Sequence, residues 1–124
     1  MSIYLFQVAS QKADWLSMRQ TAVAGNVANA STPGYRAVDL PPFSAVLDAT
    51  PVAMAATSAG HLSLPEVGRD AFREVDENPT EQTLSGNTVN LEHEMISLGD
   101  VTRDFTMTAN ISRAFHQMIL SALK

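Results

Sequence analysis

The stretch "NVANASTPGY", Asn26 to Tyr35, decides how the N-terminal third of this chain folds. Proline disfavours the α conformation at the preceding Thr32, so a helix that reaches this point has to end before it. Pro33 then presets φ for the first turn position, and Gly34 supplies the positive φ of a type II turn, which Tyr35 leaves. The sequence therefore predicts a helix that stops here and a chain that reverses direction.

The residues before this turn have the pattern of a long helix. A three-four spacing of mostly apolar side chains predicts a helical seam from about residue 2 to residue 30. Asn26 and Asn29 lie on one face of its last turns, where their amides can bond freed carbonyls or a neighbouring chain. The seam consists of Phe6, Ala9, Ala13, Leu16, Gln20, Val23, Val27 and Ala30.

The last segment, residues 90–124, repeats this pattern over about five heptads. Asn90 is the predicted N-cap, and acidic residues follow it in the positive first turn. A second apolar row near the C-terminus predicts a helix that is buried among several others. The main seam consists of Leu91, Met95, Leu98, Thr102, Phe105, Ala109, Ser112, His116, Ile119 and Leu123, and the second row of Ile111, Phe115, Met118 and Ala122.

The helix-breaking residues divide the chain into three parts. All six prolines and four of the six glycines fall between Pro33 and Gly86, so both ends can be helical and the middle cannot be one regular element. We expect an N-terminal helix and turn over 1–35, an irregular and partly mobile segment over 36–88 with the composition for a short hairpin, and a C-terminal helix over 89–124. The fold class is mainly α, with both terminal helices packed into one domain as an antiparallel, coiled-coil-like pair.

Composition excludes several classes of function. A net charge of −5 with only eight Lys and Arg residues argues against binding nucleic acid. The absence of cysteine excludes disulfides, a thiol nucleophile and zinc sites built on Cys. The N-terminus lacks the basic region of a secretory signal, and no apolar run is long enough to span a membrane.

Candidate catalytic and metal-binding groups are scattered. His61, His93 and His116 fall on different predicted elements, and "HEMIS" from His93 lacks the second His of a metalloprotease helix. The acidic stretch around Glu66 to Glu81 has no EF-hand spacing. We expect no catalytic residue, no metal, no cofactor and no small-molecule substrate.

Two motifs resemble a known family. "NVANASTPGYRAVDL" is similar to the Asn-Ile-Ala-Asn-x-x-Thr-Pro-Gly-Tyr signature of bacterial flagellar rod and hook proteins. "LSGNTVNLEHEM", Leu84 to Met95, resembles the second signature of the FlgB family of proximal rod subunits, with Asn90 where the family often has Asp. The two motifs cover about a quarter of the chain and frame the two predicted helices.

The resemblance implies a structural subunit of the flagellar basal-body rod, which polymerises helically through its terminal helices, transmits torque and surrounds the export channel. It implies a place in the basal body spanning the periplasm, and export by the flagellar type III apparatus without a cleaved signal peptide. The implied partners are other copies, other rod subunits, and base-ring, rod adaptor and export-gate proteins.

The residues expected to act in assembly form three sets. The turn set is Asn26, Asn29, Thr32, Pro33, Gly34 and Tyr35. The helix-entry set is Gly86, Asn87, Thr88 and Asn90. The interface set is Leu16, Val23, Val27, Leu98, Phe105, Ile111, Phe115, Ile119 and Leu123.

Two other functions fit the sequence less well. A cytosolic helical adaptor or export chaperone would use the same seams to bind partner helices, and it would fold as a stable soluble dimer. A small enzyme would use His61 or His93 with nearby acids, and it would need a tight monomeric core.

Overall fold

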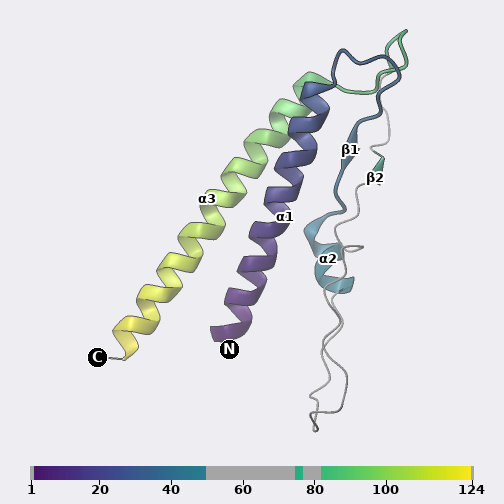
Figure 1. Ribbon diagram of the computed structural model, residues 1–124. Helices are drawn as coiled ribbons and strands as arrows, with labels where there is room; N and C mark the ends of the chain where they lie inside the picture. Colours follow the sequence, from purple (N-terminus) through teal and green to yellow (C-terminus); the bar gives the residue numbers. More distant parts are fainter. Residues whose placement is uncertain (1, 50–74, 77–81, 124) are drawn as a thin grey trace.

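The computed structural model describes residues 2–49, 75–76 and 82–123, and two long helices dominate it (Figure 1). Helix α1 spans Ser2–Ala28 and helix α3 spans Leu91–Ala122. At about 1.5 Å per residue they are roughly 40 and 48 Å long. Between them lie strand β1 (Val38–Asp39), helix α2 (Phe43–Ala49) and strand β2 (Val75–Asp76). The predicted mainly helical fold with long terminal helices is confirmed.

Helices α1 and α3 form an antiparallel pair. Both chain termini lie at the same end in Figure 1, and the cross-helix contacts run in opposite sequence order. Phe6 packs edge-on against Phe115 with ring centroids 5.7 Å apart, and Lys12 Nζ lies 3.6 Å from Asp104 Oδ2. A contact between Asn26 and Glu94 comes near the other end of the pair.

The middle of the chain contains an ordered helix that the sequence analysis missed. Helix α2 begins directly after Pro41-Pro42, and Ala45 N donates to Pro42 O at 2.9 Å. Proline has the fixed φ of a first helical position and needs no amide partner there. The prolines that indicated irregular structure therefore start a short helix, which corrects the expectation for this part of residues 36–88.

Strands β1 and β2 form a two-stranded antiparallel pair, with Val38 opposite Asp76 and Asp39 opposite Val75. The sequence has the composition for a short hairpin in this segment. This strand pair is not such a local hairpin, because 35 residues separate its two strands in sequence. Much of the segment predicted to be irregular, including most of the acidic stretch, lies outside the described residues.

The buried core lies where the β1–α2 segment packs on the helix pair. Trp15 Nε1 donates to Pro41 O at 2.9 Å, and its ring lies 5.9 Å from that of Phe43. Lys12 Nζ sits over both rings, 4.5 and 4.8 Å from their centroids. The core therefore joins all three sequence segments through Trp15, Leu16, Ala22, Leu40, Val46 and Val101. No helix in the described part of the chain is long and apolar enough to cross a membrane.

Candidate assembly site

The first signature forms the turn that ends α1. The helix stops at Ala28, two residues before the predicted end, and Thr32 N donates to Asn29 O at 2.9 Å. Tyr35 N donates to Thr32 O at 3.3 Å, and Gly34 has φ 72°. This is the positive φ that a type II turn needs at its third residue.

The second signature forms a turn that packs directly against the first. Gly86 also has a positive φ, 81°, and a Cβ added there would lie 3.5 Å from Gly34 Cα. Gly34 N donates to Ser85 O at 2.9 Å, and Thr88 N donates to Tyr35 O at 3.1 Å. The backbones of two turns about fifty residues apart in sequence are thus hydrogen-bonded to each other.

Asn87 joins this second turn to the end of α1. Its Nδ2 lies 2.9, 3.0 and 2.8 Å from the carbonyl oxygens of Asn29, Ala30 and Thr32, and its Oδ1 accepts from Val89 N at 2.8 Å. The last carbonyls of a helix have no partner within the helix. A single buried amide therefore supplies donors to the end of α1 from the entry to α3.

Asn26 and Glu94 form a second connection, inside the helix pair. Both residues are only 2% exposed. Asn26 Nδ2 donates to Val38 O at 2.8 Å and to Glu94 Oε1 at 3.0 Å, while its Oδ1 accepts from Val38 N and from Tyr35 Oη. These four bonds use both donors and both acceptor positions of the amide. From the sequence, Glu94 is only one of the acidic residues in the first turn of the helix, and this contact was not predicted.

The remaining turn and helix-entry residues have more local roles. Asn29 Nδ2 donates to Gly25 O at 2.9 Å, and Thr32 Oγ1 donates to Asn29 Oδ1. The Thr88 hydroxyl is buried and accepts from Ala37 N, and Asn90 caps α3 by accepting from His93 N at 3.1 Å. We refer to this assembly of two turns and two helix ends, residues 26–38 with 83–94, as the joint.

The chain is similar in sequence to several known proteins. No family model matches the chain. The flagellar basal body rod protein FlgB of Agrobacterium fabrum is 40% identical, over 98% of this chain and 94% of its own length. Those of Salmonella typhimurium and Escherichia coli are 31% and 32% identical, over 73% and 74% of this chain and 72% of their own.

The chain belongs to the FlgB family. It is therefore a structural component of the flagellar basal body rod and not an enzyme.

The interface residues of this FlgB-family chain differ widely in exposure. On α1, Leu16 and Val23 are buried and Val27 is half-buried. On α3 and its C-cap, Leu98, Phe115 and Ile119 are half-buried, whereas Phe105, Ile111 and Leu123 are 48%, 50% and 78% exposed. The α1 seam faces the core, and much of the α3 seam does not.

The face of α3 that contacts α1 lies beside the predicted seam. Its buried residues are Glu94, Ser97 and Val101, and they precede Met95, Leu98 and Thr102 of the seam by one residue each. One residue rotates the position by about 100° around a helix. Glu94 and Ser97 are polar, so an apolar pattern could not reveal this face. In this half of α3 the contact with α1 thus lies beside the predicted seam, whereas Phe115, nearer the C-terminus, packs on Phe6 of α1 as part of the expected interface set.

The histidines do not gather in the described residues. His93 and His116 are both exposed on α3, more than twenty residues apart, and His61 lies outside the described residues. Among the residues that the structure describes, no group of three His, Cys, Asp or Glu side chains could hold a metal ion.

Proposed function

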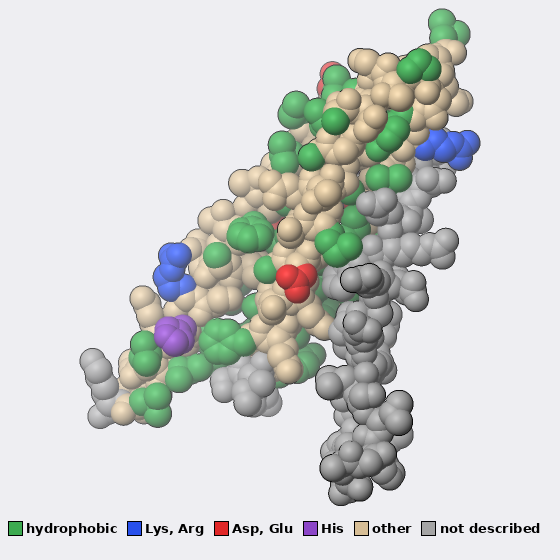
Figure 2. All heavy atoms as spheres, in the orientation of Figure 1, with side chains coloured by type: hydrophobic (Ala, Val, Ile, Leu, Met, Phe, Trp, Pro, Cys, Tyr) green, Lys and Arg blue, Asp and Glu red, His purple; other side chains and the backbone are tan. Residues whose placement is uncertain are grey.

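We propose that this chain is a rod subunit that polymerises helically through its terminal helices, transmits torque and surrounds the export channel. The observation that carries the proposal is the apolar surface that α3 leaves uncovered. Most of the exposed large apolar side chains among the described residues lie on this helix, among them Met95, Ile96, Phe105, Met107 and Ile111. Figure 2 shows hydrophobic side chains along the pair, including the end where the termini lie.

Such a surface supports assembly because apolar area in water is unfavourable. Contiguous exposed apolar patches are uncommon on monomeric soluble proteins and mark interaction sites. The joint holds one end of the pair through several buried hydrogen bonds, so the apolar faces project from a fixed base. Contacts between different faces of identical subunits form rings when the rotation closes and helical filaments when it does not, and a rod requires the second case.

The proposed partners follow from membership of the rod. They are further copies of this chain and other rod subunits, together with base-ring, rod adaptor and export-gate proteins. The proposed location spans the periplasm within the basal body, reached through the flagellar type III apparatus without a cleaved signal peptide. The turn, helix-entry and interface residues named from the sequence are the proposed assembly residues.

The free subunit is proposed to have loose helix ends that become ordered on incorporation, since their apolar faces lack partners before assembly. Circular dichroism and sedimentation of the purified chain, over a concentration series, test this. We expect helicity to rise together with growth of large assemblies. High helicity in a small oligomer of fixed size would instead support the adaptor, and a sharp, high-temperature unfolding of the dilute monomer would contradict loose ends.

A further inference from the structure

The helix pair has an open groove on the side away from the β1–α2 segment. The ammonium of Lys12 lies over Phe43 of α2. Ser10 is two residues away and therefore lies about 160° from Lys12 around the helix, on the side away from α2. Ser10 faces the groove. The groove is lined by Phe6, Ala9, Ser10 and Ala13 of α1 and by Phe105, Thr108, Ala109 and Ser112 of α3.

The chemistry of this groove selects an uncharged occupant. None of the described residues that line it is charged, and most are small. The Ser112 hydroxyl donates to the Thr108 carbonyl at 2.9 Å within its own helix, so its donor is already used. A second helix can approach closely where side chains are small, and it buries apolar area by doing so.

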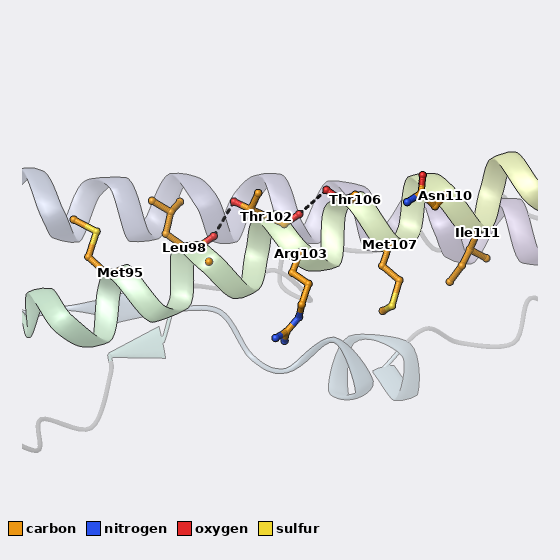
Figure 3. Close-up of a pocket in the computed structure, with 9 residues that line it drawn as sticks. Met95, Leu98, Thr102, Arg103, Thr106, Met107, Asn110 and Ile111 are labelled. Carbon is orange, nitrogen blue, oxygen red and sulfur yellow. Dashed lines mark hydrogen bonds between the residues drawn. The ribbon is translucent and has the colours of Figure 1, made fainter.

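A stripe of long apolar side chains runs along the opposite side of α3. Ile96, Met107, Ile111 and Met118 are between 50% and 65% exposed. Ile96 of the stripe is nine residues from Phe105 of the groove, and Met118 is nine residues from Ala109. Nine residues are about two and a half helical turns, so the stripe and the groove lie on opposite sides of α3. In Figure 3, Met107 and Ile111 project from α3 away from Leu98 and Thr102.

The stripe and the groove match in charge. Within the stripe, Arg103 pairs with Asp100 of its own chain at 3.0 Å, so this turn brings no net charge to an uncharged groove. Asp14, one helical turn beyond Ser10, is exposed at the rim of the groove. The Arg103 guanidinium of a docked second copy, whose side chain is 73% exposed, can be shared between its own Asp100 and this carboxylate.

We infer that the occupant of the groove is a second copy of this chain, whose α3 stripe packs between α1 and α3 of the first. This rests on the proposed function and identifies the two faces that meet. Methionine side chains adapt to an irregular groove. Because stripe and groove are different surfaces on opposite sides of one helix, the contact leaves a stripe and a groove free at the two ends and continues to further copies.

Cross-linking between single-cysteine variants tests the inference, because the chain has no cysteine of its own. Ser10→Cys marks the groove and Met118→Cys marks the stripe. The two variants are mixed at concentrations that assemble and treated with a short bis-maleimide. We expect the mixed Ser10→Cys and Met118→Cys dimer as the dominant product. Ala45→Cys, exposed on α2, is the control and should cross-link weakly with either variant.

The possible results separate this inference from the proposed function. If the chain assembles but each variant links mainly to itself, or the mixed dimer is no stronger than the Ala45→Cys control, the groove and stripe assignment is overturned while polymerisation stands. If sedimentation shows no assembly at any concentration, both fail.

A variant that fills the groove gives a second test without cross-linking. Ala109 is exposed, so Ala109→Trp can enter the groove without displacing a buried side chain. We expect loss of assembly with the helicity of the dilute chain unchanged, whereas Ala45→Trp should assemble normally. Normal assembly by Ala109→Trp would overturn the inference.

Discussion

The two ends of the helix pair are built in different ways. At the joint, Asn26, Asn87 and Glu94 are buried, each bonded through its side chain to backbone or to another side chain. At the end near the termini, Phe6 and Phe115 provide an aromatic contact, and exposed apolar side chains such as Leu120 surround it. The first end satisfies its polar groups within the chain, and the second leaves apolar groups exposed.

This difference indicates which interactions form before assembly. Buried hydrogen bonds fix one geometry because an unmatched donor or acceptor is costly. Half-exposed apolar side chains gain little until a partner covers them. Stability of the free chain should therefore depend on the joint and the adjoining core, and assembly on the exposed faces.

The largest effect on the free chain is expected for Leu16→Ala. Leu16 is fully buried in the core, and such truncations cost about 2 to 5 kcal/mol of unfolding free energy. Urea unfolding followed by fluorescence of Trp15, the only tryptophan, measures the loss directly because Trp15 lies in the same core.

The matched control is Ile111→Ala on the exposed part of α3. Ile111 is 50% exposed, so its truncation should change the free energy of unfolding by less than about 0.5 kcal/mol but weaken sedimenting assemblies. Equal destabilisation of the dilute chain by both variants would break the distinction between the two ends.

A somewhat smaller loss is expected for Asn87→Ala. The change removes the side-chain donor to the carbonyls of Asn29, Ala30 and Thr32. The Asn29 and Thr32 carbonyls keep backbone donors, so the loss falls mainly on Ala30 O. An unsatisfied buried group costs about 1 to 3 kcal/mol, so we expect a loss of roughly 2 kcal/mol. Hydrogen exchange at the end of α1 should quicken.

Asn110→Ala is the control for this substitution. Asn110 is exposed on α3, and its Oδ1 accepts one long hydrogen bond, of 3.5 Å, from Arg113 Nη1. We expect a change below about 0.5 kcal/mol. If Asn87→Ala proved as mild as Asn110→Ala, the joint would not be what holds the two helices at this end.

The sequence allowed the joint to be predicted in part, because its turns depend on local chemistry. Pro33 and Gly34 specify a turn on their own, and Asn90 specifies a cap. The contact between Asn26 and Glu94 joins residues 68 apart through polar groups, and no apolar period can indicate it. A family resemblance marked Asn87 as important without revealing the three carbonyls that it bonds.

The faces of α3 were harder to predict for a related reason. An apolar period locates a stripe but cannot say whether the chain itself or another copy covers it. Here Glu94 and Ser97 face α1, while more apolar side chains such as Phe105 stay exposed. The apolar surface of α3 is therefore wider than α1 covers within the chain.

The smallest effects compare one substitution at two glycines. A Cβ at Gly34 or at Gly99 would meet no atom within 4 Å, so crowding cannot separate Gly34→Ala from Gly99→Ala. Gly34 has φ 72°, where a side chain costs roughly 1 kcal/mol or somewhat more. Gly99 lies inside α3, where alanine is favoured by about 0.5 to 1 kcal/mol.

The two variants should therefore shift stability in opposite directions. Gly34→Ala is expected to lower the urea midpoint reported by Trp15, and Gly99→Ala is expected to raise the same midpoint. Since neither replaces a packed side chain, the sign of each shift reports only the backbone conformation at that glycine. A stabilising Gly34→Ala would mean that the turn is not held at positive φ in the free chain, and that the joint forms only when subunits meet.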